Sequence, residues 1–219
     1  MGDPVNELNL WKQRLGAVPD SVWDETGIET LILADNALPS VSAKIARLTC
    51  LRTLDLGHNQ LAEIPEALGE LVQLDRFLYL HDNRLTTLPL SLARLTSLRY
   101  LNLSQNALTR VPEAVTALLD LIELRLSDNR IEELPSALGR LVRLRELHLR
   151  NNRLTTVPET LGELEDLRQL DLRGNPLVAL PGVIASLPRL EKLDLRWTPT
   201  LPDLPWFAEL EARGCLVYR

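Results

Sequence analysis

Residues 51–74 read LRTLDLGHNQLAEIPEALGELVQL, and this stretch decides the fold because near copies of it recur along the 219-residue chain. Asparagines recur every 23 residues, apart from one step of 24 between Asn59 and Asn83. Around nearly every asparagine, apolar residues stand at offsets −8, −5, −3, +2 and +5. The repeated asparagines are Asn36, Asn59, Asn83, Asn106, Asn129, Asn152 and Asn175. Gln13 and Thr198 continue the spacing at the two ends, so nine units cover nearly the whole chain.

Each unit is predicted to contain one short strand and one short helix. Leu54 and Leu56 alternate with Thr53, Asp55 and Gly57, which indicates a strand with one buried face. Strands repeated in register form a parallel sheet. Seven units carry a proline at offset +6, where it suits the first turn of a helix. The asparagine stands where the chain leaves the strand, and its amide is expected to pair with buried backbone groups of neighbouring turns.

The repeat, written LxxLxLxxNxLxxLPxxLGxLxx, resembles the leucine-rich repeat. Its "LP" pair is similar to the intracellular subtype found in Ras-pathway scaffold proteins, plant intracellular Ras-group proteins and bacterial relatives. The resemblance implies an α/β solenoid, or horseshoe, with a concave parallel sheet and short convex helices. It implies one domain over residues 1–219, with units starting near 5, 28, 51, 74, 98, 121, 144, 167 and 190 and a C-terminal cap at 205–219.

The two ends of the array lead to different expectations. At the C-terminus, residues 205–210 indicate a helix, Gly214 its end, and residues 216–218 a last strand or lid. Only four residues precede the first unit, which begins at Val5. Either Trp11 and Trp23 cover that end, or the chain is a fragment of a longer protein. An uncovered first unit would also predict a dimer formed through it.

Composition limits the classes of partner and the compartment. A net charge of −6 argues against nucleic-acid or anionic-membrane binding, and no apolar run is long enough to span a bilayer. No secretion signal is visible. Cys50 and Cys215 lie 165 residues apart, which favours a reducing compartment over a disulfide. We therefore expect the cytoplasm, with a secreted effector acting in a host cytosol as the alternative.

The concave face carries an aromatic cluster. Offsets −6, −4 and −2 from each asparagine are expected to face the concave surface, and there stand Phe77, Tyr79 and Tyr100, with His81 beside them. Aromatic anchors near the middle of such a surface are typical of a binding hot spot. The alternative is that the extra residue of this unit, within 74–78, makes the strand entry bulge and turns Phe77 into the core.

Basic side chains occupy the same face further along the chain. Arg150, Arg173 and Arg196 share one column, with Arg125 and His148 close by. One interpretation is a solvated lattice of ion pairs with acidic residues in neighbouring columns, which adds little stability. The other is a docking stripe for an acidic segment, which would use the bidentate geometry of arginine.

The pair of His58 and His81 does not predict a metal site. His58 and His81 fall on neighbouring rungs, but two histidines without a third ligand make a weak site. Surface histidines explain them more simply, and a pH-sensitive contact is the alternative.

No catalytic motif and no cofactor-binding motif occurs in the sequence. The expectation is therefore a non-enzymatic scaffold that binds a protein or peptide on its concave face. Two alternatives remain open. The chain could be the targeting segment of a larger enzyme, such as a bacterial effector ubiquitin ligase or a repeat-bearing kinase. It could also be a glycan receptor that stacks sugar rings on its aromatic residues.

Overall fold

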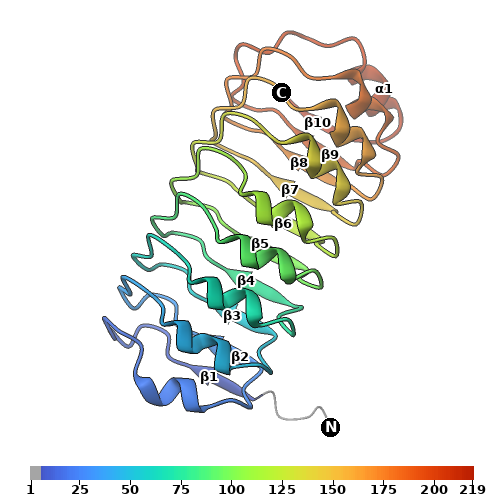
Figure 1. Cartoon of the computed structure of the whole chain (residues 1–219). Coiled ribbons are helices and arrows are strands. Elements are labelled where there is room, and N and C mark those ends of the chain that lie inside the picture. The colour runs from blue at the N-terminus through green and yellow to red at the C-terminus, as the bar shows by residue number, and fades with distance from the viewer. Residues whose placement is uncertain (1–5) are drawn as a thin grey trace.

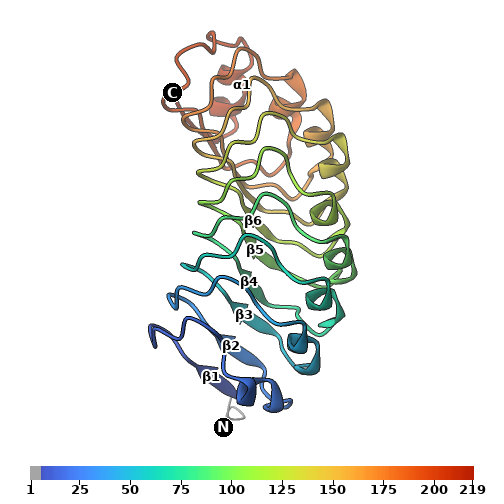
Figure 2. The same cartoon turned by 60° about the vertical axis from the view of Figure 1, so that its left-hand side comes forward.

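The chain is an elongated stack of similar coils, each contributing one strand to a single open sheet (Figure 1). The structure is a computed structural model that describes residues 6–219, so Val5 lies outside the described part. The ten strands are all parallel and follow one another in chain order, from β1 to β10. Figure 2 shows the helices stacked on the side of each coil away from the strands. Among the described residues, no helix is long and apolar enough to cross a bilayer.

Every element is short. The strands are β1 (Glu7–Asn9), β2 (Thr30–Ile32), β3 (Thr53–Asp55), β4 (Phe77–Tyr79), β5 (Tyr100–Asn102), β6 (Glu123–Arg125), β7 (Glu146–His148), β8 (Gln169–Asp171), β9 (Lys192–Asp194) and β10 (Leu216–Tyr218). The 3₁₀ helices are η1 (Asp20–Asp24), η2 (Ala43–Arg47), η3 (Glu66–Glu70), η4 (Leu90–Arg94), η5 (Glu113–Ala117), η6 (Ser136–Arg140), η7 (Glu159–Glu163) and η8 (Gly182–Ser186). One α-helix, α1 (Phe207–Ala212), follows them.

The hydrophobic core runs along the inside of the stack, between the strands and the 3₁₀ helices. The leucines at offsets −8, −5 and −3 are buried in successive units, as Leu51, Leu54 and Leu56 illustrate with no exposed surface. The residue between two buried strand leucines points away from the helices, because strand side chains alternate. We call the surface made by these outward side chains the sheet face.

The 24-residue step does not disturb the register of the sheet. Thr53 pairs with Phe77, Leu54 with Leu78 and Asp55 with Tyr79, as in every other pair of strands. The extra residue is taken up before β4, where Asp75 accepts two hydrogen bonds from Arg52. Leu78 is fully buried, whereas Phe77 is 41% exposed. The alternative that a bulge turns Phe77 into the core is therefore wrong, and Phe77 faces outward, as the binding interpretation requires.

The prolines lie just before the helices and not, as was predicted, in their first turn. Each stands just before a 3₁₀ helix, as Pro65 does with φ −65° and ψ 143°, and its carbonyl accepts the hydrogen bond that closes the first turn, from Leu68. Ser42 takes the place of proline in the second unit, and its hydroxyl accepts from the backbone N–H of Lys44. A serine in this position is a good helix cap, so the second unit keeps the same start.

A ladder of asparagines connects each coil to its neighbours. Asn152 shows the pattern: its Nδ2 donates to the carbonyls of Leu149 in its own unit and Leu126 in the preceding one, both at 2.9 Å. Its Oδ1 accepts from the backbone N–H of Ile131 at 3.0 Å. The same bonds recur through most of the array with a shift of one unit. Gln13 and Thr198, at the ends, make only local bonds.

The two ends of the stack differ. At the C-terminus, α1 packs its Phe207 and Leu210 into the core, Gly214 follows it with φ +88°, and β10 pairs with β9. Residues 216–218 therefore form a strand and not a lid. At the other end, Trp23 is buried in the core, whereas Trp11 is 53% exposed and lies beside Lys12. Trp11 therefore does not cover the first unit.

Candidate functional site on the sheet face

Phe77, Tyr79 and Tyr100 form one contiguous cluster on neighbouring strands β4 and β5. The ring centroids of Tyr79 and Tyr100 lie 5.0 Å apart, and those of Phe77 and Tyr100 lie 5.4 Å apart. Phe77 stacks on Tyr79 at 5.9 Å. Aromatic contacts of this kind hold the rings in place, so the cluster offers a preorganised apolar surface to a partner.

Burial changes the acidity of both phenols. Burial raises the pKa of Tyr79, and the carboxylates of Asp55 and Glu123 raise it further. For Tyr100, burial is again the main cause, and it raises the pKa to about 12 although the charge of Arg125 opposes it. Both hydroxyls are therefore neutral at ordinary pH and are available as hydrogen-bond donors and acceptors.

We expect Tyr100 to lose its proton only near pH 12, where its folded-state pKa lies. The folded state keeps this proton above the ordinary tyrosine pKa of about 10. The associated stabilisation is therefore complete below pH of about 10 and is lost as the pH rises towards 12. An ultraviolet titration of tyrosinate should show a late step that disappears in Tyr100→Phe and in denaturant. A late step of unchanged size in the variant would contradict the assignment.

His58 and His81 extend the aromatic surface towards the strand exit. Their rings meet edge to face with centroids 4.7 Å apart, and His58 Nδ1 lies 2.5 Å from Asp82 Oδ2. The ring of His81 lies over Gly57, where a Cβ would come within 3.0 Å of three ring atoms. Burial, helped by the charge of His58, lowers the pKa of His81. His81 is therefore a fixed, neutral part of the surface.

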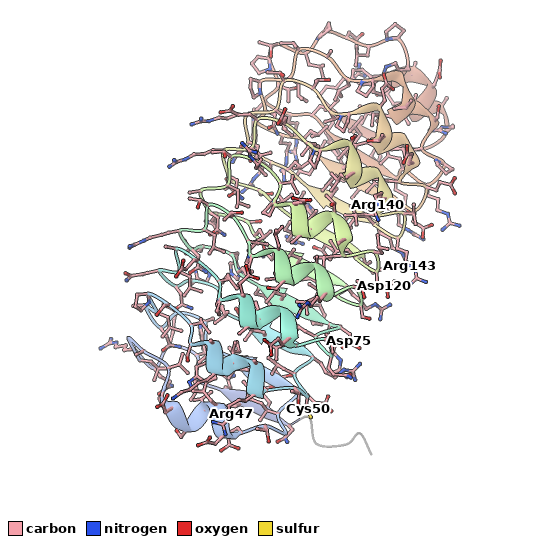
Figure 3. The ribbon with its side chains drawn as sticks, viewed as in Figure 1. Arg47, Cys50, Asp75, Asp120, Arg140 and Arg143 are labelled. Carbon is pink, nitrogen blue, oxygen red and sulfur yellow. The ribbon has the colours of Figure 1, made fainter. Side chains whose placement is uncertain are left out.

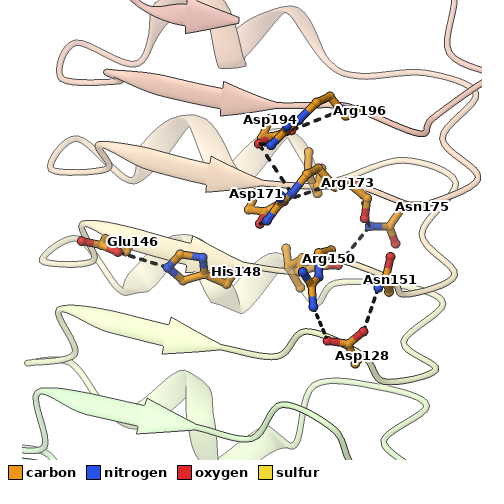
Figure 4. Close-up of polar contacts among 12 residues, drawn as sticks. Asp128, Glu146, His148, Arg150, Asn151, Asp171, Arg173, Asn175, Asp194 and Arg196 are labelled. Atoms are coloured by element: carbon orange, nitrogen blue, oxygen red, sulfur yellow. Dashed lines mark hydrogen bonds and ion pairs between the residues drawn. The ribbon is translucent and has the colours of Figure 1, made fainter. Parts of the chain in front are cut away.

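The arginine column is engaged in ion pairs (Figure 4). Arg173 binds Asp171 through two hydrogen bonds of 2.9 and 2.6 Å, and Arg196 binds Asp194 through two of 3.0 and 2.8 Å. Arg150 reaches across to Asp128 in the preceding unit at 3.0 Å. These contacts match the ion-pair interpretation of the column, and its role in binding a partner stays a prediction.

Asp194 is the most buried carboxylate of this lattice, with 1% of its side chain exposed. Burial alone would raise its pKa, but the hydrogen bond from Arg196 and the charge of Arg173 outweigh burial and lower the pKa. Buried carboxylates are tolerated only when they are paired in this way. Asp194 therefore belongs to the structure of the last unit.

Arg125 and His148 belong to a second polar group. Arg125 Nε lies 2.5 Å from Glu123 Oε1, and His148 Nε2 lies 3.1 Å from Glu146 Oε2. Glu123, Glu146 and His148 each bring one ligand atom within 4.8 Å of the others, a spacing that a metal ion could bridge. The bond to Arg125 holds one of these carboxylates in competition with such an ion. Glu123 and Glu146 were expected as ion-pair partners in a neighbouring column, and they do lie on adjacent rungs, but their grouping with His148 as three possible ligands was not predicted.

A polar hollow of about 300 Å³ lies between the aromatic cluster and the arginine column. It opens where Ser104 and Ser127 follow their strands, because these small side chains stand between the larger His81 and Arg150. His81 and Arg150 line the hollow, and among the described residues His81 Nδ1 and Arg150 Nε are buried beneath its surface without a hydrogen-bond partner. The lining is mostly polar, with Ser104, Ser127 and Asn102 among its members, so this hollow is a place where a polar group of a ligand would fit.

The structure thus places all the predicted site residues on one face, in two groups separated by the hollow. Phe77, Tyr79, Tyr100 and His81 form the first group, and Arg125, His148, Arg150, Arg173 and Arg196 form the second. Asp128 was missed, because it stands one residue before Asn129, outside the three offsets that were expected to face the surface. Asp128 would have been predicted if each arginine of the column had been paired with an acidic residue 22 positions earlier in the chain.

Comparison with solved structures finds the same architecture elsewhere. A leucine-rich repeat protein of Leptospira interrogans superimposes with a TM-score of 0.79 at 24% identity, over 97% of this chain and 65% of that one. The PEPR1–AtPEP1 complex gives 0.71 at 26% identity, over 86% of this chain and 31% of that one. The ectodomain of the Arabidopsis thaliana membrane receptor kinase GASSHO1/SCHENGEN3, in complex with CASPARIAN STRIP INTEGRITY FACTOR 2, gives 0.66 at 30% identity.

That last alignment covers 93% of this chain and 28% of the receptor chain, so the chain spans less than two thirds of each of the three structures. No curated protein matches the sequence. A family model described as "Leucine rich repeat" matches residues 76–131, 119–177 and 142–199, and a second one matches residues 50–71. Together with the regular coils and the asparagine ladder, these matches show that the chain belongs to the leucine-rich repeat family.

Proposed function

We propose that the chain is a non-enzymatic scaffold that binds a peptide segment of a partner protein on its sheet face. The observation that carries this proposal is the aromatic cluster, whose rings contact one another while Phe77 remains 41% exposed. Large apolar side chains in mutual contact at the surface mark interaction sites more reliably than scattered ones do. Two of the similar structures are complexes, PEPR1–AtPEP1 and the receptor ectodomain with its integrity factor, which supports a binding role.

Preorganisation explains how such a face would bind. The strands are fixed by the sheet on both sides and by leucines that are fully buried beneath them. A ligand that lies across them therefore causes little loss of conformational freedom in the protein. The neutral phenols of Tyr79 and Tyr100 add hydrogen bonding to the apolar contact.

The binding role predicts a clear effect of removing the two tyrosines. We expect Tyr79→Ala/Tyr100→Ala to weaken binding by about tenfold or more, since each is in the position of a hot-spot residue. The experiment is a selection of random displayed peptides on the immobilised wild type, followed by affinity measurements on both proteins. The matched control is Leu90→Ala/Val142→Ala, which removes exposed apolar side chains outside the aromatic cluster.

Circular dichroism would first establish that the three proteins fold alike. Peptides that bind all of them equally would contradict the proposal and place the binding site elsewhere. If the selection yields no peptide and the wild type binds glycans, the ligand of the sheet face is a carbohydrate and the proposal of a peptide ligand is wrong.

We also propose that the protein works in a reducing compartment such as the cytoplasm. Cys50 is exposed and Cys215 is buried in the C-terminal cap, and neither is in a disulfide. Burial raises the pKa of Cys215, so this thiol is protonated and suited to packing more than to chemistry.

A further inference from the structure

A second column of side chains runs along the edge of the sheet where the strands begin. Each of its members directly precedes a strand, at offset −7 from the asparagine. We call this set the rim column. From the second unit to the ninth, its residues are Glu29, Arg52, Arg76, Arg99, Ile122, Arg145, Arg168 and Glu191. Five arginines therefore share one edge of a chain whose net charge is −6.

The outer arginines of this column are neutralised by carboxylates of the chain itself. Arg52 binds Asp75 at 2.9 and 2.5 Å, and Arg168 binds Glu191 at 2.9 Å. Arg76 lies 3.8 Å from Glu29, at the limit of an ion pair. Ion pairs also connect successive units outside the rim column, as between Arg143 and Asp120 at 2.8 Å (Figure 3).

Arg99 and Arg145 break this pattern. Within residues 6–219, neither has a carboxylate oxygen within 4.0 Å of its guanidinium group, and both side chains are exposed. The unit between them carries Ile122 at this position, and an isoleucine offers no carboxylate to neutralise either arginine. The middle of the rim column therefore has two cations without an anion and an apolar side chain between them.

These residues line a pocket that continues the aromatic cluster. The pocket measures about 400 Å³ and is lined by three arginines, Arg76, Arg99 and Arg145, by Phe77, Tyr100 and Ile122, and by one carboxylate, Glu123. Glu123 is already bound to Arg125 at 2.5 Å. The apolar part is thus formed by the same rings that are proposed to hold the partner.

We propose that this pocket binds an acidic side chain of the partner peptide, with its carboxylate above Ile122 between Arg99 and Arg145. The inference rests on the proposed function, because an apolar residue next to the acidic one would lie on Phe77 and Tyr100. Neighbouring strands are about 4.8 Å apart, so the backbones of Arg99 and Arg145 are about 10 Å apart and their long side chains can converge on one carboxylate. Guanidinium groups pair with carboxylates through two parallel hydrogen bonds, which makes the site selective for that group.

The test is a peptide selection on the wild type and on Arg99→Gln/Arg145→Gln, with the sequences of the selected peptides as the first readout. We expect the wild type to enrich Asp or Glu next to an apolar residue, and the variant to lose the acidic preference while it keeps the apolar one. The matched control is Arg94→Gln/Arg140→Gln, which removes the same charge from two exposed arginines on the 3₁₀ helices.

A selected peptide and its copy with Glu→Gln or Asp→Asn then give the second readout. Replacing the carboxylate should weaken binding to the wild type by about tenfold, since a charge-assisted hydrogen bond is lost. The same replacement should have little effect on binding to Arg99→Gln/Arg145→Gln. Added NaCl should weaken binding of the acidic peptide and leave the neutral copy less affected.

The outcomes separate this inference from the proposed function. Peptides without acidic enrichment that still depend on Tyr79 and Tyr100 would overturn the acidic pocket and leave the scaffold standing. Equal acidic enrichment on wild type and arginine variant would also overturn it. If inorganic phosphate displaces the peptide as readily as N-acetylglutamate does, the pocket is an unselective anion site, and the proposed selectivity for a carboxylate is overturned. If the wild type selects no peptide at all, both proposals fail.

Discussion

Replacing Asn152 with alanine is expected to lower the free energy of unfolding by about 3 kcal/mol or more. Alanine would leave the buried backbone N–H of Ile131 without a partner, and the carbonyls of Leu126 and Leu149 would each lose one of two bonds and keep those from Asn129 and Asn175. A buried polar group left unpaired costs about 1–3 kcal/mol, and each further hydrogen bond lost costs about 0.5–1.5 kcal/mol. The measurement is the denaturant midpoint of unfolding, compared with that of the wild type.

The matched control for this change is Asn102→Ala. Asn102 carries the same amide on the sheet face, where it is half-buried and its Oδ1 accepts one bond from Ser104 at 3.0 Å. Its loss should cost no more than about 1 kcal/mol. A similar cost for both variants would show that the ladder contributes no more than a surface hydrogen bond.

Replacing Gly69 with alanine is expected to destabilise the protein by about 2 kcal/mol or more. Gly69 lies in η3, and a Cβ there would come far closer than 3.0 Å to the backbone oxygen of Ser91 in η4. Backbone cannot move aside as a flexible side chain can, so the two coils would have to separate. Thermal and denaturant unfolding of the purified variant would measure the effect.

Gly182→Ala is the control, because Gly182 also lies in a 3₁₀ helix but has open space where the Cβ would be. There the substitution should be neutral or stabilise by about 0.4–1 kcal/mol, since alanine restricts the unfolded chain. If Gly69→Ala and Gly182→Ala shift the midpoint equally, close packing between η3 and η4 is not what requires the glycine.

The repeat spacing was enough to predict the sheet, the core and the columns of the sheet face. The reason is that leucines at offsets −5 and −3 fix which strand side chains are buried, and the residues between them must then point outward. Tyr79 and Tyr100 could be placed side by side on this basis alone. The position of Phe77 could not be predicted. The sequence does not say whether the extra residue distorts the strand or is accommodated before the strand begins, as it is at Asp75.

Two other features were beyond the sequence pattern. The helical segments are 3₁₀ helices that begin after the proline, since the short return path between strands leaves room for about one and a half tight turns. The rim column was missed for a different reason. It stands at offset −7, outside the three offsets expected to face the surface, and it depends on contacts between residues about 23 positions apart.

The alternation along each strand also has a consequence for how this surface can change over time. Apart from buried carboxylates such as Asp194, the side chains that face outward are different residues from the leucines that hold the coils together. Substitutions at the exposed outward positions therefore alter recognition while they leave the core intact. A new partner can be acquired one column at a time, and whole coils can be gained or lost in steps that preserve the alignment of every remaining rung.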